Sequence, residues 1–250
     1  MNMYERVLLN HKSVRTFQDR PVDEALVKRL VRCGQHSATS EFIQSYTVIH
    51  ITDRKLQETI YEEVANQKTL LRAPTLLIFL ADVNRLLRAS AMNGRTAPES
   101  YLEATETFLM ASVDTAIMAQ TVSIAAEMEG LGCTYIGGIR NNLDRLSRLL
   151  KLPEGVYPLF GMVMGYPAED SGEMAKPRLP LEVVYKENYY DTDGDEEALK
   201  RYDEVIRNYY INRTGGERNE TWTQQMSDFV EKPQRPALRR VLKEQGFKIL

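Results

Sequence analysis

The sequence has little cysteine and little histidine, and both shortages narrow what the protein can be. Only two cysteines occur in 250 residues, Cys33 and Cys133. They are too few for a disulfide framework and too far apart in sequence for a metal pair. The three histidines do not pair with one another or with a cysteine at zinc-ligand spacing. The sequence therefore indicates two reduced thiols in a cytoplasmic protein, and it predicts no metal site.

Excess positive charge and long apolar runs are also missing. The net charge is −3, which argues against broad nucleic-acid binding because that usually needs a basic face. No window holds the roughly 18 consecutive apolar residues of a membrane span, and no apolar run follows the first charges, so we expect neither membrane segment nor signal peptide. Hydrophobic residues make up 43% and charged residues 27%, as in ordinary globular proteins. A chain of this length forms one large domain or two small ones.

Against this mildly acidic background, one short stretch is dense in groups that bind anions. Between His11 and Arg15 the chain offers an imidazole, an ammonium, a hydroxyl and a guanidinium, and Phe17 follows. Such a cluster near the N-terminus is either a solvated face or one wall of a phosphate site. The stretch alone does not decide between these readings.

Hydrophobic periodicity predicts a mixture of helices and strands. Apolar residues at helical spacing predict helices, and β-branched or continuous apolar runs predict strands. The predicted strands cover 46–51, 76–81, the residues from 133, and 159–167, and the predicted helices cover 3–9, 23–34, 56–66, 104–129, 143–150 and 198–210. Residues 91–98, with Asn93-Gly94, have no clear pattern and predict a mobile loop.

The helix predicted over 104–129 is the longest, and it is apolar on nearly every side. A helix of this kind must be buried all round. In a chain of this size we expect a second subunit to cover one of its faces. A protein that sediments strictly as a monomer would contradict this expectation.

Several weaker signals have an ordinary structural explanation when each is taken alone. The hydroxyl-rich loop at 37–41 reads as a turn or as a source of hydroxyl and backbone donors. Gly137-Gly138 reads as a strand-to-helix turn or as a close approach to a ligand. Arg213 and Arg218, on a loop with Gly215-Gly216, read as solvated cations.

The order of these motifs along the chain carries a resemblance. The sequence resembles the nitroreductase superfamily, most closely its NADPH-dependent flavin reductases and major oxygen-insensitive nitroreductases. The resemblance covers essentially the whole chain, and it rests on His11–Phe17, Thr39-Ser40, Gln67-Lys68, Tyr135–Asn142, the 159–167 strand, Lys176–Pro180 and the region of Arg213, Arg218 and Trp222.

The resemblance implies a fold, an assembly and an activity. The fold is α+β, with a mixed central sheet flanked by helices and a C-terminal arm that wraps the partner of a homodimer. We expect one domain over 1–250, with a core to about 180 and the arm over 181–250. The implied activity is transfer of a hydride from NADPH through tightly bound FMN to nitroaromatics, quinones or free flavin, by a ping-pong mechanism without an obligatory protein acid or base.

The resemblance also implies roles for individual residues. His11, Ser13, Lys176 and Arg178 hold the FMN phosphate with Lys12 nearby, and Arg15 meets the N1/C2=O edge of the ring, where a cation favours the reduced flavin. Thr39, Ser40, Gln67, Lys68 and Thr69 contact the ribityl chain or the pyrimidine edge, the backbone of Gly137 and Gly138 approaches N5 and O4, and Tyr135 and Ile136 line the ring. Arg213 and Arg218 bind the 2′-phosphate of NADPH, and Arg235, Glu41 and Phe42 lie near the acceptor.

The sequence departs from the family pattern at two positions, and two other functions remain as alternatives to the one that the resemblance implies. Lys12 stands where the family commonly has arginine, so the charge remains without the bidentate fork. Glu41 stands in a loop that is usually nearly all serine, where a carboxylate could alter substrate choice. The alternatives are a non-catalytic FMN- or nucleotide-binding module and a dimeric interaction protein without a cofactor. The colour of the purified protein separates these readings, since bound FMN is yellow.

Overall fold

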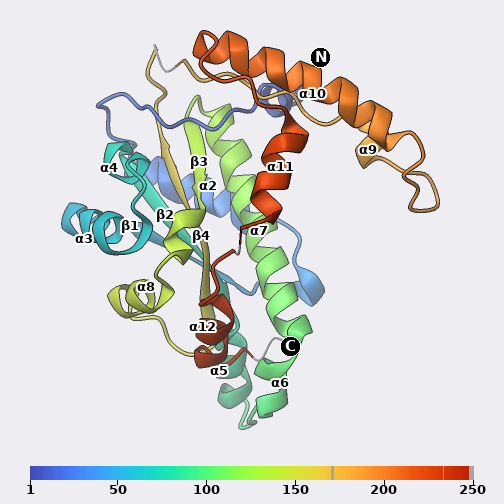
Figure 1. The fold of residues 1–250 in the computed structure, drawn as a ribbon. Helices are drawn as coiled ribbons and strands as arrows, with labels where there is room; N and C mark the ends of the chain where they lie inside the picture. The colour runs from blue at the N-terminus through green and yellow to red at the C-terminus, as the bar shows by residue number, and fades with distance from the viewer. Residues whose placement is uncertain (170–171, 233, 248–250) are drawn as a thin grey trace. The chain divides into compact units, whose positions relative to one another are not determined.

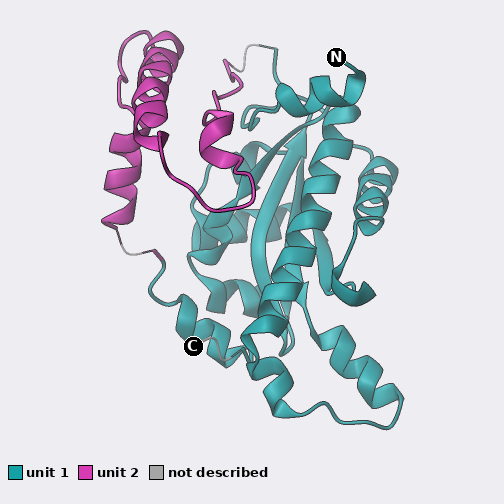
Figure 2. Cartoon of the chain, turned by 90° about the vertical axis from the view of Figure 1, so that its right-hand side faces the viewer, with its two compact units in different colours: residues 1–171, 235–250 teal, residues 172–234 magenta. Residues whose placement is uncertain are grey.

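The computed structural model describes residues 1–169, 172–232 and 234–247. It divides into two compact units, shown in Figure 2. The first comprises residues 1–171 and 235–250, and the second comprises 172–234. The predicted division into a core to about 180 and an arm beyond it stays a prediction.

A four-stranded sheet forms the centre of the first unit (Figure 1). Its strands are β1 (Tyr46–Ile51), β2 (Thr75–Asp82), β3 (Gly132–Ile136) and β4 (Val156–Gly165), in the order β1-β2-β4-β3. Each neighbouring pair is antiparallel. The one described parallel pairing is an isolated bridge between Ser13 and Cys133, which adds the N-terminal segment beside β3. The predicted α+β class is confirmed.

The side chains of β2 alternate between two hydrophobic cores, because successive residues of a strand point to opposite faces. Leu76, Ile78 and Leu80 join one core, and Leu77 and Phe79 join the other. All eight residues of the strand are buried. This double burial explains why the sequence reads there as a continuous apolar run rather than an alternating one.

Helices cover both faces of the sheet (Figure 1). One core is closed by residues of α3 (Arg54–Ile60), the π-helical turn η2 (Tyr61–Ala65), α4 (Thr69–Arg72) and α8 (Leu143–Leu150), and the other by α2 (Glu24–Gln35) and α7 (Thr105–Met128). The remaining elements of this unit are α1 (Met3–Leu9), η1 (Ser40–Phe42), α5 (Asn84–Met92), α6 (Glu99–Glu103), η3 (Gly137–Arg140) and α12 (Leu238–Glu244).

Helix α7 is buried along one side only within the chain. Ala111, Met118 and Val122 are almost fully buried against the sheet, whereas Leu109 and Ile117 are 53% and 42% exposed. By length and composition alone α7 could cross a membrane, but the core helix of a soluble protein passes the same test. The apolar residues of α7 therefore form two opposite stripes, of which the chain itself covers one, and the predicted cover of the other by a second subunit stays a prediction.

The second unit is helical and has its own small core. It contains α9 (Leu181–Val184), α10 (Asp195–Thr214) and α11 (Trp222–Val230). Tyrosines and an isoleucine of α10 pack with Leu179 and Trp222, and the rings of Tyr202 and Trp222 meet edge-on with centroids 6.1 Å apart. Helix α10 is longer at both ends than the predicted helix over 198–210.

Two other predicted boundaries also differ. The segment at 91–98 begins inside α5, which ends only at Met92. The predicted helix over 56–66 changes to π-helical geometry at Tyr61, and Asn66 ends it in the left-handed conformation. Both differences lie where local propensity is weak and packing decides the last turn.

Candidate functional site

The basic segment lies in extended conformation beside β3. The Val14 N–H donates to the Cys133 carbonyl at 2.9 Å, and the Thr134 hydroxyl donates to the Val14 carbonyl at 2.6 Å. Gly132 permits this approach, because a Cβ there would lie 2.4 Å from Val14 Cγ2. The parallel bridge joins Ser13 to Cys133 of β3, and Phe17 then pairs with Pro167, which follows β4. The basic segment is therefore a fixed part of the fold and not a free tail.

Extended geometry separates the side chains of this segment. Residues 13 and 15 point to one side of an extended chain and residues 12 and 14 to the other. Val14 is 2% exposed, and it shares a cavity of about 330 Å³ with Lys12 and Pro167. On the other side, an Arg15 guanidinium nitrogen lies 3.2 Å from the Ser13 carbonyl, to which it donates. Lys12 therefore lies on the opposite side of the segment from Ser13 and Arg15. The presence of lysine where the family commonly has arginine then matters less for the side that carries Ser13 and Arg15.

His11 forms an ion pair with a residue far away in the sequence. Its Nδ1 lies 2.6 Å from Oε1 of Glu127, which is in the last turn of α7. The two side chains are 30% and 14% exposed. Burial raises the pKa of the Glu127 carboxyl, and the imidazole acts in the opposite direction. The sequence analysis missed Glu127, since nothing in the spacing connects residues 11 and 127.

Gly138 and Gln67 come together at the end of β3. A Cβ at Gly138 would lie 2.6 Å from Gln67 Oε1 and 3.0 Å from the Ala65 carbonyl. The turn can therefore take no larger residue without displacing Gln67 or the π-helical turn. Lys68 is exposed beside Gln67, and Thr69 begins α4. Gly137-Gly138 and Gln67 come from two separate motifs and thus lie together. This group is called the glycine cradle.

Two arginines lie against the same glycine turn. Arg235 donates from Nη2 to the Gly137 carbonyl at 3.3 Å, and its buried Nε has no hydrogen-bond partner. A Cβ at Gly137 would lie 3.6 Å from Nη2 of both Arg140 and Arg235. Burial lowers the pKa of Arg140, and the neighbouring Arg235 lowers it further. Arg140 was not predicted, although a cation directly after Gly-Gly was a usable signal.

Tyr135 and Ile136 precede this turn and differ in exposure. Tyr135 is 36% exposed, and its hydroxyl donates to Gln120 at 3.2 Å. Burial of the ring is the main cause of its raised pKa. The Ile136 side chain is 1% exposed and belongs to the hydrophobic core. Ile136 can therefore line a ligand only with its backbone, and its predicted place beside the ring stays a prediction.

The loop after Thr39 has a strained backbone. Glu41 and Phe42 both have positive φ, 46° and 61°, which non-glycine residues seldom adopt. The Ser40 N–H donates to the carboxylate of Asp114 at 2.9 Å. Asp114 is 1% exposed, and its other oxygen has no hydrogen-bond partner. Helix α7 therefore holds the start of the loop through a buried carboxylate.

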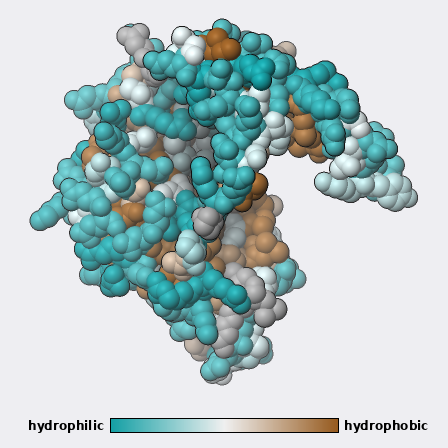
Figure 3. Space-filling view, in the orientation of Figure 1, coloured by the Kyte–Doolittle hydropathy of each residue, from teal (hydrophilic) through white to brown (hydrophobic). Residues whose placement is uncertain are grey.

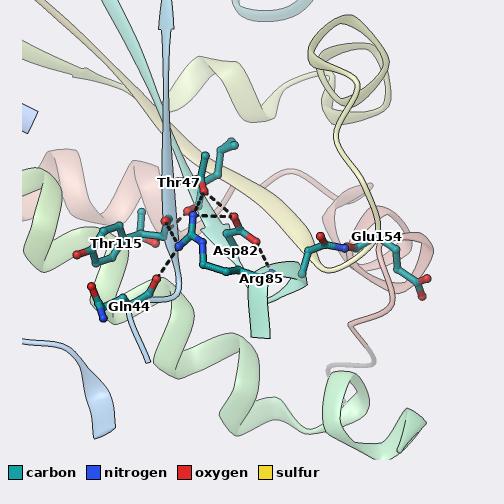
Figure 4. Close-up of polar contacts among 9 residues, drawn as sticks. Gln44, Thr47, Asp82, Arg85, Thr115 and Glu154 are labelled. Carbon is teal, nitrogen blue, oxygen red and sulfur yellow. Dashed lines mark hydrogen bonds and ion pairs between the residues drawn. The ribbon is translucent and has the colours of Figure 1, made fainter. Parts of the chain in front are cut away.

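Arg85 holds the end of the same loop (Figure 4). Its guanidinium donates to the Gln44 and Tyr46 carbonyls at 2.9 and 3.0 Å and to the Thr47 hydroxyl at 2.7 Å. Asp82 completes the network, accepting from Thr47 at 2.5 Å. Between these two anchors Phe42 is 81% exposed. A large apolar side chain is thus held outward on a strained but fixed loop.

Two further predicted cations lie in the second unit. Lys176 and Arg178 are exposed, and Arg178 donates to the Lys176 carbonyl at 3.1 Å. The carbonyl of the intervening Pro177 accepts from the Tyr202 hydroxyl at 2.9 Å. This contact ties the extended segment to α10, so both cations have a fixed backbone.

Arg213 and Arg218 do not share one loop as predicted. Arg213 lies in the last turn of α10 and donates to the Tyr209 hydroxyl at 3.1 Å. Arg218 lies beyond the helix, over the ring of Tyr210 with its Cζ 4.1 Å from the centroid, and it pairs with Glu220 at 2.5 Å. The error arose because α10 continues to Thr214, past the predicted end.

The arrangement in the first unit can hold an anion and a flat polar group. His11 and Ser13 begin the extended segment and Arg15 follows, beside the first residues of β3, and the glycine cradle follows the last residue of that strand. Among the described residues, no group of three or more histidine, cysteine or acidic side chains is placed to hold a metal ion. The chemistry offered is therefore hydrogen bonding and positive charge.

Family models and relatives match nearly the whole chain. The model of the nitroreductase family matches residues 8–166, and that of the nitroreductase family C-terminal domain matches 176–249. An "FMN reductase (NADPH)" of Bacillus subtilis is 38% identical over 99% of both chains. An "oxygen-insensitive NADPH nitroreductase" of Salmonella typhimurium is 39% identical over 96% of both. The solved NfrA1 nitroreductase of B. subtilis has a TM-score of 0.92 at 37% identity, covering 98% of this chain and 99% of that one.

Proposed function

The chain belongs to the nitroreductase family, and from that premise we propose that it passes hydride from NADPH through flavin N5 to nitroaromatics, quinones or free flavin. It is an NAD(P)H-dependent FMN oxidoreductase with FMN as its cofactor. The observation that carries the finer proposal is that β3 has the row of anion donors fixed beside its first residues and the glycine cradle beside Gln67 directly after its last.

The residues present fit FMN. A dianionic phosphate needs several donors, and His11 and Ser13 supply two of them. Charge-assisted hydrogen bonds of this kind contribute about 1.5–3 kcal/mol each. The crowding at Gly138 fits a backbone that must approach a flat ring closely. When bound, FMN supplies the hydride-accepting and hydride-donating atom.

Individual side chains have distinct tasks in this proposal. Arg15 places a fixed positive charge beside the pyrimidine edge and favours the reduced flavin. Thr39, Ser40, Gln67, Lys68 and Thr69 bind the ribityl chain and that same edge. Tyr135 bounds the ring, while the backbone from Ile136 to Gly138 faces its N5 and O4 atoms.

The nicotinamide donor and the acceptor use one open site in turn. Such double use predicts ping-pong kinetics, with parallel lines in double-reciprocal plots. Arg213 and Arg218 bind the 2′-phosphate of NADPH. Arg140 and Arg235 favour acceptors that carry or develop negative charge near the glycine turn, and Glu41 and Phe42 border the same opening.

The assembly proposed is a cytoplasmic homodimer. The exposed apolar stripe of α7 supports it, because a contiguous apolar surface of this kind marks an interface. Figure 3 shows apolar residues exposed in the region where α7 runs in Figure 1.

The experiment combines colour with two variants. The purified protein should be yellow, release FMN on denaturation and oxidise NADPH with a nitroaromatic, a quinone or free FMN. Arg15→Ala should slow reduction of the bound flavin about tenfold or more while FMN is retained, on the scale of one charged interaction. His11→Ala should lose FMN but recover its rate at saturating FMN. A colourless protein that does not take up FMN would overturn the proposal.

A further inference from the structure

The contact between His11 and Glu127 joins the anion-binding segment to the long helix of the core. The imidazole Nδ1 lies 2.6 Å from the carboxylate, and the two residues are 116 positions apart in the sequence. Only 14% of the Glu127 side chain is exposed. One ring nitrogen of His11 is therefore fully occupied, and whatever His11 does for a ligand it must do through Nε2.

Glu127 is in an unfavourable place for a carboxylate. It lies in the last turn of α7, where the partial negative charge of the helix end repels an anion and attracts a cation. It is also largely removed from solvent. A carboxylate at such a position needs a cationic partner, and the helix end itself stabilises a charged imidazole.

The protonation of His11 decides which ligands it can bind. A neutral ring that donates Nδ1–H to Glu127 leaves Nε2 as a bare acceptor, which repels a phosphate oxygen. A charged imidazolium donates from both nitrogens at once. When Glu127 is ionised, only the charged ring can connect it on one side with an anion on the other, and when Glu127 is protonated it can donate to Nδ1 and leave Nε2–H as the donor.

We propose that Glu127 is a positioning residue that fixes the His11 ring through Nδ1, so that Nε2–H donates to the FMN phosphate. The inference rests on the proposed function and adds a residue to it. The same logic holds for metal-bound histidines, whose second nitrogen is commonly oriented by a carboxylate. Arg6 and Lys12 line the same cavity as Glu127.

The chain provides a matched control for this role. Glu129 lies two residues further on, at the end of the same helix, and pairs with the exposed Arg29 at 2.7 Å. Glu127→Gln and Glu129→Gln therefore remove the same charge from nearly the same place, but only the first touches His11. We expect FMN titrated into the apoprotein to bind Glu127→Gln about 10- to 100-fold more weakly than wild type, the range typical for such supporting partners. Glu129→Gln should stay within about twofold, since it removes only an exposed pair.

A double variant tests whether Glu127 acts through His11. If it does, His11→Gln/Glu127→Gln should bind FMN no more weakly than His11→Gln alone. A spectroscopic measurement gives an independent reading. With only three histidines in the chain, long-range ¹H–¹⁵N spectra should show His11 with a protonated, hydrogen-bonded Nε2 in the FMN complex of the wild type and without that hydrogen bond in Glu127→Gln.

The outcomes separate this inference from the proposed function. If the wild type does not bind FMN, the proposed function falls and the inference falls with it. If the wild type binds FMN and Glu127→Gln binds it equally well, the inference alone is overturned. The inference would also be overturned if His11→Gln/Glu127→Gln lost as much FMN affinity as the two single variants lose together. Should Glu127→Gln melt far below Glu129→Gln, Glu127→Asp is the second variant, and an unchanged FMN affinity there would count against the role.

Discussion

At Gly132 the absence of a side chain decides where the anion-binding segment lies. A Cβ at this position would lie 2.4, 2.5 and 2.8 Å from three atoms of Val14. Val14 is itself buried and is hydrogen-bonded to β3 on both sides of its peptide. It cannot move aside alone, so an added methyl group must displace the whole segment from His11 to Arg15.

We therefore expect Gly132→Ala to cost about 1–3 kcal/mol of unfolding free energy, the usual range for an overpacked site. FMN affinity should fall at the same time, because the phosphate donors shift with the backbone. Gly137→Ala is the control for stability, since its Cβ would meet only the ends of two arginine side chains at 3.6 Å. Urea denaturation of both variants measures the difference. Equal stability of the two would show that the segment is not held by this contact.

At the scale of elements, the loop from Thr39 to Gln44 is strained yet fixed. Three of its residues, Glu41, Phe42 and Gln44, have positive φ. Each left-handed residue of this kind costs roughly 1 kcal/mol, so anchors are needed to maintain the conformation. The anchors are Asp114 at Ser40 and Arg85 at Gln44.

Removing one anchor should loosen the loop without unfolding the protein. Asp114→Ala deletes the acceptor for Ser40 and also removes a buried carboxylate oxygen without a partner, so global stability should change little. Chymotrypsin should then cleave after the exposed Phe42 about tenfold faster, because local opening exposes the peptide. Asp114→Asn keeps an acceptor at the same place and should cleave at nearly the wild-type rate. Equal cleavage of Asp114→Ala and wild type would contradict the anchoring role.

The sequence predicted best those helices and strands whose apolar residues recur at the regular spacing of a buried face. The strand over Tyr46–Ile51 and the helix Thr105–Met128 agree with prediction within a residue or two at each end. The ends of α10 were missed because its last turns are amphipathic only weakly, and Arg213 was misplaced as a result. The partners Glu127 and Asp114 were missed for another reason. Each acts through a contact between segments far apart in sequence, which local patterns do not contain.

At the scale of the whole molecule, α7 is apolar both on the face that packs in the core and on the face that the chain leaves exposed. Its inner stripe fills the core against β2 and β4. Its outer stripe includes Leu109, Val113 and Ile117, whose side chains are 53%, 44% and 42% exposed respectively. Residues four apart lie above one another on a helix, so these three form a continuous line. A line of this kind is stabilised when a second copy of the helix packs against it.

Ile117→Lys tests whether that line holds the dimer together. A charge in the middle of an apolar interface has no partner there, so its desolvation disfavours association strongly. We expect sedimentation to show the wild type as a dimer and Ile117→Lys as mainly monomeric at micromolar concentration, with a melting temperature that no longer rises with protein concentration. Met92→Lys, which charges an apolar side chain that is 87% exposed at the end of α5, should leave the dimer intact. A dimeric Ile117→Lys would place the interface elsewhere, and a monomeric wild type would remove the proposed assembly, because the outer stripe of α7 would then face solvent in the functional state.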